Sequence, residues 1–322
     1  MLKDITTYIK SCDQCQRRGK PQGKHELYPI KVKEPFYQIG IDIVGPLPQT
    51  EKGNKYIVVA IDYFTKWPEA KALKEASAKE VSTFIFEDII CRHGCPQKIL
   101  SDRGSHFNNQ LIKDLTQKFE IRHNFSTLYH SKTNRLVERF NKTLCEALAK
   151  LSQETTKWDE NISPVLFAYR TKKNDSTKIQ PFYLTYGRQA KLPTDNDDIK
   201  ESNISERLIH LIDKLPQERY QAKIEITNSQ EQQKEYYDKK GKRKQDFKIG
   251  EKVLYYNAAK EKQWSGKLDE KWKGPYYIHE ILLNGVYKLK ETNGKILRTP
   301  VNGEWLKIYY SRENFEPIVL IN

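Results

Sequence analysis

The sequence has few of the features that mark secreted, membrane-bound or disulfide-stabilised proteins. Its 322 residues include five cysteines, an odd number, at spacings that do not suggest a disulfide framework in a chain of this length. The longest apolar runs, such as YIVVAI at 56–61, are far shorter than the roughly 18 residues of a membrane span. The N-terminus, MLKDITTYIK, lacks the apolar stretch of a signal peptide. Secretion and membrane insertion are therefore not expected, and a reducing compartment fits the cysteines better.

Positive charge is what the chain has in excess. The formal net charge is +14, while 37% of the residues are hydrophobic, enough for a sizeable core. Between residues 239 and 273, twelve Lys and Arg face five Asp and Glu, so this stretch carries half of the net charge. A basic surplus of this kind favours a polyanionic partner, most commonly nucleic acid. The alternative is a basic surface that only keeps the protein soluble.

Hydrophobic periodicity predicts an α/β core with a mixed sheet. Alternating or continuous apolar runs predict strands, of which the one containing Pro68 should lie at a sheet edge. A capping box, SAKE at 77–80, starts a helix that Gly94 ends. Further helices are expected over residues 109–119 and from Leu136 onward. The predicted strands cover residues 38–44, 56–62, 66–73, 97–102 and 121–126.

The second half of the chain changes character twice. A helix is predicted over residues 158–171, and the charged, Gln/Glu-rich stretch 200–238 is typical of long solvated helices. Beyond it, short β-type segments separated by Gly, Pro and Asn predict a small all-β barrel of about five strands. Cys91 and Cys95, four residues apart near a helix end, are expected to be buried or half-buried thiols rather than metal ligands.

Three carboxylates occupy positions that suggest chemistry. Asp42 lies within an apolar strand, on the face opposite Ile39, Ile41 and Ile43, and Asp102 ends another strand. Glu138 lies on the polar border of an amphipathic helix, with Lys142 four residues on. Each has a simpler explanation: Asp42 could form a turn or cap at a strand end, and Asp102 could belong to an ordinary turn. Glu138 could form a solvated pair with Lys142. Carboxylates that converge at one edge of a sheet are costly unless a cation binds, and Mg²⁺ prefers such oxygen ligands.

Three segments resemble the signature segments of the integrases of retroviruses and long-terminal-repeat retrotransposons. They are IGIDIVGPLP at 39–48, ILSDRGSHFNN at 99–109 and YHSKTNRLVERFNKTL at 129–144, with 35 residues between Asp102 and Glu138. CDQCQRRGK is similar to the end of the family's zinc-binding N-terminal domain. KLDEKWKGPYYIHEILLNGVYKLKE resembles the Gly-Pro-Tyr/Phe module of Ty3/gypsy-type elements. The resemblance implies a zinc-domain remnant with linker (1–34), a ribonuclease-H-like catalytic core (35–195), a helical linker (196–238), an SH3-like basic barrel (239–312) and a tail (313–322).

The resemblance also implies a reaction and its residues. Asp42, Asp102 and Glu138 would bind two Mg²⁺ or Mn²⁺ ions. Metal-activated water would trim the 3′ end of element DNA, and the freed 3′-hydroxyl would attack target DNA in the nucleus. The implied partners are DNA and further copies of the chain, with no membrane and no small-molecule substrate. Lys142 of the core is expected to contact DNA, as are Lys242, Arg243 and Lys244 of the barrel; His130 and Asn134 either contact DNA as well or only shape a turn.

Two departures from the family pattern lead to an alternative. The family's Zn²⁺ ligands include a His pair upstream of the Cys pair, whereas Cys12 and Cys15 have no upstream His in this chain. We interpret Met1 as an internal methionine of a longer polyprotein. The family's loop His-Pro-Gln-Thr-Asn-Gly-Gln reads HSKTNRL here, with Ser131, Lys132 and Arg135 as replacements. The alternative function is therefore a truncated or domesticated remnant that binds DNA without catalysis.

Overall fold

The computed structural model divides the chain into two compact units. One is Ile30–Glu231, and the other combines Met1–Pro29 with Gln232–Asn322. The structure describes residues 9–18, 21, 29–126, 135–152, 154–192, 195, 204–239, 247–256, 270–282 and 285–311. None of the helices formed by these residues has the length and hydropathy required to cross a membrane.

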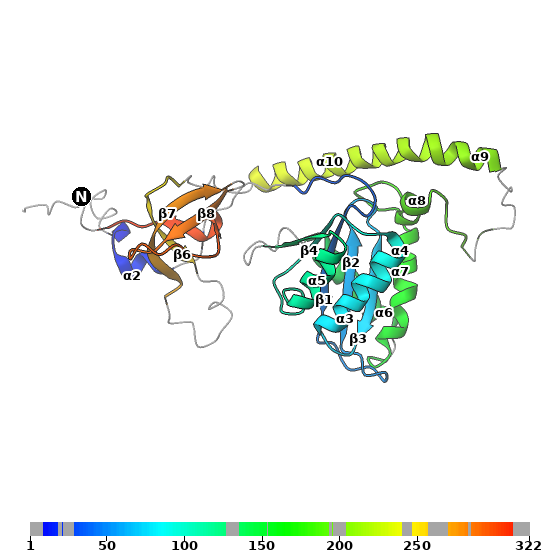
Figure 1. The fold of residues 1–322 in the computed structure, drawn as a ribbon, viewed down its shortest axis with the longest axis horizontal. Helices are drawn as coiled ribbons and strands as arrows, with labels where there is room; N and C mark the ends of the chain where they lie inside the picture. The colour runs from blue at the N-terminus through cyan, green and yellow to red at the C-terminus, as the bar shows by residue number, and fades with distance from the viewer. Residues whose placement is uncertain are drawn as a thin grey trace, which may run out of the picture. The chain divides into compact units, whose positions relative to one another are not determined.

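The first unit is built on a five-stranded mixed sheet in the order β3-β2-β1-β4-β5 (Figure 1). Its central strand β1 pairs antiparallel with β2 and parallel with β4. The predicted strands are all present, and β3, which begins at Pro68, lies at the expected edge. Their bounds are β1 Gln38–Val44, β2 Tyr56–Asp62, β3 Pro68–Leu73, β4 Lys98–Ser101 and β5 Arg122–Phe125.

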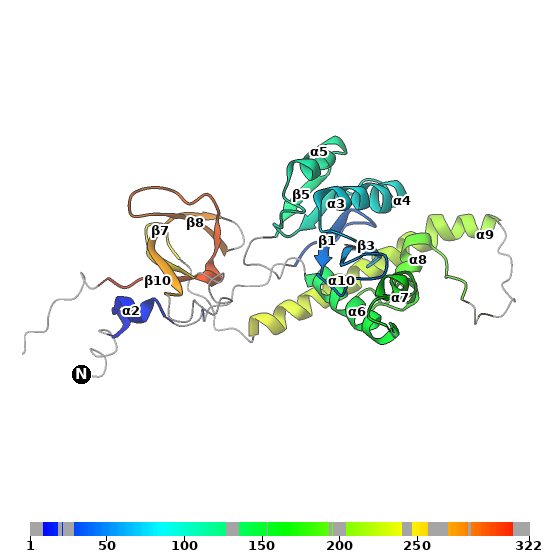
Figure 2. The same ribbon diagram turned by 90° about the horizontal axis from the view of Figure 1, so that it is seen from below.

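Helices cover both faces of this sheet (Figure 2). Alternate residues of β2 supply the two cores: Val58 and Ala60 pack with α3 and α5, while Val59 and Ile61 pack with α6 and α7. This alternation follows from the two-residue period of a strand, and a strand buried on both faces reads as a continuous apolar run. The helices are α3 Ala78–Phe84, α5 Gln110–Lys118, α6 Arg135–Leu151 and α7 Ile162–Thr171, the last preceded by a 3₁₀ turn, Trp158–Asn161.

The predicted helix that starts at the capping box is one continuous helical run. α3 passes into a π-helical segment, Ile85–Ile90, and then into α4 Cys91–His93, which ends at Gly94 with φ +86°. The Ser77 side chain accepts a hydrogen bond from Glu80 N, as a capping box requires. The Glu80 carboxylate, however, accepts from Glu75 N at 3.0 Å.

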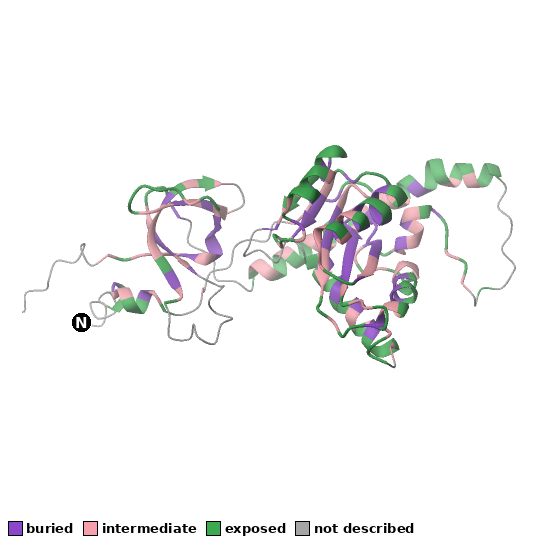
Figure 3. Ribbon diagram, turned by 60° about the horizontal axis from the view of Figure 1, so that its bottom comes forward, coloured by how far each residue is buried: buried purple, intermediate pink, exposed green. Residues whose placement is uncertain are grey.

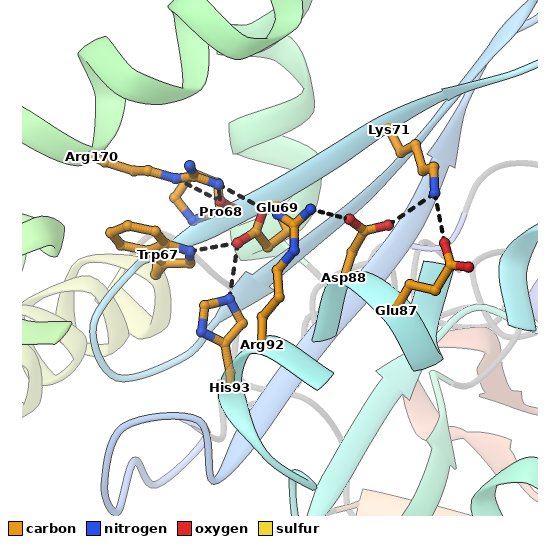
Figure 4. Close-up of polar contacts among 9 residues, drawn as sticks. All are labelled: Trp67, Pro68, Glu69, Lys71, Glu87, Asp88, Arg92, His93 and Arg170. Atoms are coloured by element: carbon orange, nitrogen blue, oxygen red, sulfur yellow. Dashed lines mark hydrogen bonds and ion pairs between the residues drawn. The ribbon is translucent and has the colours of Figure 1, made fainter. Parts of the chain in front are cut away.

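Buried ionic contacts attach helices from both layers to the edge strand β3 (Figure 4). Glu69 accepts hydrogen bonds from Trp67 Nε1 (2.9 Å) and Arg170 Nη2 (2.7 Å), and His93 Nε2 lies 2.9 Å from its carboxylate. Burial alone would raise the pKa of Glu69, but His93, Arg170 and Trp67 outweigh it and lower that pKa. Since His93 belongs to α4 and Arg170 to α7, one carboxylate joins both helices to β3.

The segment predicted to form long helices does so. α9 Ile204–Ile209, a π-helical segment His210–Lys214 and α10 Leu215–Lys239 follow one another without a break. The short helix α8 Pro181–Tyr186 precedes them, and the carbonyls of its last residues accept hydrogen bonds from Arg207 and Arg219. Leu215, Ala222 and Ile226 are the buried residues of α10.

The C-terminal module, residues 247–311 as described, is a second five-stranded sheet with the order β10-β6-β7-β8-β9 and only antiparallel pairs. Val253, Ile278 and Leu289 lie in its core, and Figure 3 shows buried residues along its strands. The predicted mixed-sheet core and small SH3-like β-module are thus both confirmed. The strands are β6 Lys252–Tyr256, β7 Trp272–Leu282, β8 Val286–Lys290, β9 Val301–Asn302 and β10 Leu306–Ile308, with a 3₁₀ turn at Gly303–Trp305. A short N-terminal helix, α2 Asp13–Gln16, belongs to the same unit.

Candidate active site

Asp42 lies on the central strand β1, on the face that carries α6. Its neighbours Ile39 and Ile41 pack into the opposite core, as their alternation with Asp42 requires. The Asp42 carboxylate is half-buried, and its Oδ2 accepts a hydrogen bond of 2.8 Å from Asn141 Nδ2 of α6. A strand position thus places this carboxylate against the helix that also carries Glu138.

Asp102 follows β4, the parallel neighbour of β1. Its Oδ1 accepts a hydrogen bond from Gly104 N (2.9 Å) and lies 3.8 Å from His106 Nε2. The preceding residue, Ser101, is fully buried, and its hydroxyl donates to the Asp102 carbonyl oxygen at 2.7 Å. The same hydroxyl lies 2.8 Å from His123 Nε2 of β5, and burial lowers the pKa of His123 to about 4. A neutral histidine and a serine therefore fix the backbone where the chain leaves β4.

Glu138 is in the first turn of α6 and is exposed. Burial raises its pKa, and Arg135 opposes that effect. The buried Tyr63, next to the end of β2, has a pKa raised by burial and by the Glu138 charge, so the phenol and the carboxylate are near one another. Lys142 is not the partner of Glu138: its ammonium lies 3.8 Å from Glu146, and its side chain is 78% exposed. The alternative interpretation of Glu138 and Lys142 as a solvated pair is therefore wrong.

Electrostatics links the three carboxylates. The pKa of Asp42 is raised to about 6, first by burial and then by the negative charges of Asp102 and Glu138, while hydrogen bonds from Ile43 and Asn141 oppose the rise. Like charges affect one another in this way only across short separations in a site of restricted solvent access. The ends of β1 and β4 and the first turn of α6 thus converge on one region.

Asn141 is a residue of this region that the sequence did not single out. Its side chain is buried, its Nδ2 donates to Asp42, and its Oδ1 has no hydrogen-bond partner among the described residues. The available signal was its spacing, because Asn141 follows Glu138 by three residues and both therefore project from one side of α6. A buried asparagine among the apolar residues of a helix face also needs a polar partner.

The chemistry of these side chains suits a hard divalent cation. Asp42, Asp102 and Glu138 offer carboxylate oxygens, and the raised pKa values of Asp42 and Glu138 show that negative charge there is not fully compensated. Within the described ranges, however, no three His, Cys, Asp or Glu side chains are grouped closely enough to hold a metal ion. One reason for this wider spacing is that Asp102 Oδ1 accepts a hydrogen bond from the backbone of its own loop.

The remaining predicted site residues divide into two groups. Cys12 and Cys15 lie side by side without a disulfide between them, since a hydrogen bond with Cys12 raises the pKa of Cys15. No third ligand joins them among the residues that the structure covers, so this donor pair does not fit a four-ligand zinc site. The others lie outside the described residues: His130, Asn134, Lys242, Arg243 and Lys244. Cys91 and Cys95 are exposed, so the expectation of buried or half-buried thiols was wrong; Cys91 is on α4, whereas Cys95 follows the end of that helix at Gly94.

Comparison with known families gives a match to part of the first unit. Residues 32–131 match the model of the integrase core domain, a range that includes Asp42 and Asp102. This segment of the chain is similar to an integrase core domain. Residues 247–310 match a second family, described as a domain of unknown function, which coincides with the C-terminal module.

Relatives extend the likeness beyond the integrase core domain. The chain is 29% identical over 323 residues to the Retrovirus-related Pol polyprotein from transposon 412 of Drosophila melanogaster, covering 97% of this chain and 25% of that protein. It is 27% identical over 334 residues to Gypsy retrotransposon integrase-like protein 1 of Homo sapiens, covering 98% of this chain and 63% of that protein. The chain thus spans a quarter to under two thirds of these relatives. The likeness to these relatives therefore extends over nearly the whole length of this chain.

A solved structure shows the same fold. A chain in the structure of the simian T-cell lymphotropic virus intasome in complex with PP2A regulatory subunit B56 gamma superposes with a TM-score of 0.59. The sequence identity is 15%, and the alignment covers 96% of this chain and 91% of that one. The match therefore concerns the fold, for both the integrase core domain and the C-terminal module.

Proposed function

We propose that this chain is a divalent-metal-dependent polynucleotidyl transferase that trims the 3′ ends of retrotransposon DNA and joins them to target DNA in the nucleus. The observation that carries the proposal is the raised pKa of Asp42, caused by burial and by the charges of Asp102 and Glu138. Perturbed carboxylates of this kind cluster at catalytic sites. The integrase core domain supplies the reaction class.

In this proposal Asp42, Asp102 and Glu138 hold the cation, Mg²⁺ or Mn²⁺. When bound, the divalent cation supplies Lewis-acid stabilisation of the attacking and leaving oxygens of an in-line phosphoryl displacement. Asn141 is a positioning residue, because its amide fixes the orientation of the Asp42 carboxylate. Ser101 and His123 have a similar supporting role at the backbone of Asp102.

The proposed DNA contacts come from both units. Lys142 is exposed on the same helix as Glu138, so its ammonium is available to a phosphate once the weak contact with Glu146 is given up. We extend the proposal to His130 and Asn134 and to Lys242, Arg243 and Lys244, on the sequence resemblance. The assembly proposed is a homo-oligomer on DNA ends.

A strand-transfer assay tests the proposal. The purified chain is incubated with Mg²⁺ or Mn²⁺ and an oligonucleotide duplex that carries an element end with a recessed 3′-hydroxyl. Asp102→Asn is expected to lower product formation by at least about a hundredfold, because it removes a charged ligand. Asp114→Asn, an exposed acid on α5, is the matched control and should retain wild-type activity. Equal product from wild type and Asp102→Asn would reject the catalytic assignment.

One observation favours the alternative of DNA binding without catalysis. The described residues do not bring three carboxylates close enough to hold a metal ion. In this alternative the basic C-terminal module retains DNA through phosphate contacts. Binding that is unchanged by Asp102→Asn, steeply salt-dependent, and accompanied by no strand transfer in either metal would support it. Binding that survives removal of residues 239–312 would exclude that role for the module.

A further inference from the structure

The N-terminal segment, residues 9–18, contacts the C-terminal module through a set of specific hydrogen bonds. Gln16 Nε2 donates to Tyr310 O (3.0 Å), and Tyr310 N donates back to Gln16 Oε1 (2.8 Å), although 294 positions separate the two residues. The side-chain amide of Gln16 thereby forms two hydrogen bonds with the backbone of Tyr310, just beyond β10. The backbone of a neighbouring strand would make the same kind of paired contact. β10 is an edge strand of its sheet, and such edges offer unpaired backbone groups.

The next residue, Arg17, is held by three partners. Its guanidinium donates to Gly274 O (3.0 Å), to Glu270 (3.3 Å) and to Asp13 of its own segment (2.7 Å). The hydrogen bond from Arg17 lowers the pKa of Asp13. Gly274 has φ +124°, a conformation that side-chain-bearing residues rarely adopt, so a glycine shapes the backbone that presents this carbonyl. The Arg17 side chain is only 15% exposed.

Backbone contacts complete the docking. Lys271 N donates to Arg17 O at 3.0 Å, and Lys307 Nζ reaches Arg18 O at 3.5 Å. Lys307 also lies over the Trp272 ring, 4.1 Å from its centroid, and burial lowers the pKa of Lys307 to about 8. The segment therefore meets β7 and β10 at once. Both side-chain and backbone groups of the segment thus have hydrogen-bonding partners on the module, which favours selective recognition.

The interface is polar rather than a continuation of the core. Gln16 and Ser11 are buried, whereas Ile9 remains 55% exposed. An open cleft of about 290 Å³ remains where Cys15 and Gln16 of the segment face Lys307, Ile308 and Tyr310. Contacts of this kind, made mainly of directional hydrogen bonds, resemble the docking of a peptide on a domain more than the packing of a domain interior.

We propose that the C-terminal module carries a peptide-recognition surface and that residues 9–18 of this same chain are its ligand. The surface consists of the edge of β10 with Tyr310 and the start of β7 from Glu270 to Gly274. Its specificity comes from the Gln16 amide and the Arg17 guanidinium. The inference does not depend on the proposed catalysis.

Backbone amide exchange in the full-length chain tests docking directly. Gln16→Ala removes the acceptor of the Tyr310 amide, but the Lys271 amide bonds to a backbone carbonyl that this substitution leaves in place. If the segment docks as a unit, Gln16→Ala should accelerate exchange at both amides by about tenfold, the factor expected for loss of one or two net hydrogen bonds. Lys10→Ala, which removes a charge from the same segment and none of these bonds, is the matched control.

A second measurement restores the contact in trans. A synthetic peptide of residues 9–18, added at millimolar concentration because an intramolecular ligand is present at about that effective concentration, should slow exchange again in the Gln16→Ala chain. The same peptide with Gln16→Ala should have no effect. Exchange at Ile278, whose amide bonds Glu251 within the module, should stay constant and shows that the fold is intact.

Two results would overturn the proposal. One is acceleration confined to Tyr310 with Lys271 unchanged, which would mean that Gln16 makes a local contact and no docked unit exists. The other is failure of the unmodified peptide to restore protection while Ile278 shows an intact module. Strand-transfer activity plays no part in either readout, so failure here leaves the proposed reaction untouched.

Discussion

Asp42→Asn is expected to stabilise the metal-free protein while removing the proposed metal-dependent activity. The pKa of Asp42 rises from an ordinary value of 3.8 to about 6 on folding, a change of about two units. At about 1.4 kcal/mol per unit, ionised Asp42 costs the folded state about 3 kcal/mol above pH 6. Asparagine loses this penalty, and the opposing hydrogen bonds from Ile43 and Asn141 are already included in the raised pKa. The net gain should therefore be about 3 kcal/mol at pH 7.

The sign of the pH dependence follows from the direction of the shift. A carboxyl with a raised folded-state pKa binds its proton more tightly in the folded state, so its stability contribution is lost as pH rises from about 4 to about 6. The difference in free energy of unfolding between Asp42→Asn and wild type should thus be near zero at pH 4. It should increase up to pH 6 and stay constant above it. Added Mg²⁺ should narrow the gap by stabilising the wild type.

Urea unfolding at pH 4, 5, 6 and 7, with EDTA and then with Mg²⁺, measures this effect. Asp114→Asn is the control for loss of an exposed carboxylate and should change stability by less than about 0.5 kcal/mol at every pH. The reasoning is refuted if Asp42→Asn is no more stable than wild type at pH 7 in EDTA, or if the gap is the same at pH 4 and pH 7.

Three further outcomes are expected. Asn141→Ala should weaken Mg²⁺-dependent strand transfer about 10- to 100-fold with the fold retained, since the amide orients Asp42; an unchanged Mg²⁺ titration would contradict this. Glu69→Gln should destabilise the integrase core domain by about 3 kcal/mol in urea unfolding, because Arg170 would keep a buried, unpaired charge; the loss should shrink in acid, as pH falls through the lowered pKa of Glu69. Replacing Lys242, Arg243 and Lys244 together by alanine should leave the base preference of DNA binding unchanged. It should reduce the slope of the logarithm of the DNA-binding constant against the logarithm of the salt concentration by up to about 3, as measured by filter binding.

Hydrophobic pattern was enough to predict most elements of the integrase core domain. β1 and β2 were predictable because one alternates and the other is continuously apolar, and each pattern has one physical explanation in a sheet covered by helices. The edge position of β3 followed from Pro68, which cannot donate to a sheet ladder. The helix after Ser77 followed from its cap. Strand order did not, because pattern does not encode which strands pair.

The candidate site was predictable only in part, for a related reason. Asp42, Asp102 and Glu138 could be selected because carboxylates in apolar surroundings are unusual and their spacing matched a family. Asn141 was not selected, because its three-residue spacing from Glu138 becomes informative only once its partner 99 positions away is known. Docking of residues 9–18 on the C-terminal module was equally hidden, because Gln16 and Arg17 bind backbone groups, which leave no trace in sequence composition.

The position of β1 in the middle of its sheet has a consequence for how the site is inherited. Asp42 faces Val59 of β2, and the residues just before it are in register with Ile99 and Leu100 of β4. A shift of one residue would turn Ile41 or Ile43 toward α6 and push the carboxylate into the opposite apolar core. A variant with this register shift would fold poorly and would be selected against for that reason alone, whether or not its chemistry was affected. Selection for a well-packed core therefore also keeps the Asp42 side chain on the α6 side of the sheet. No separate selection for catalysis is needed, so this holds even in a descendant protein that no longer catalyses a reaction.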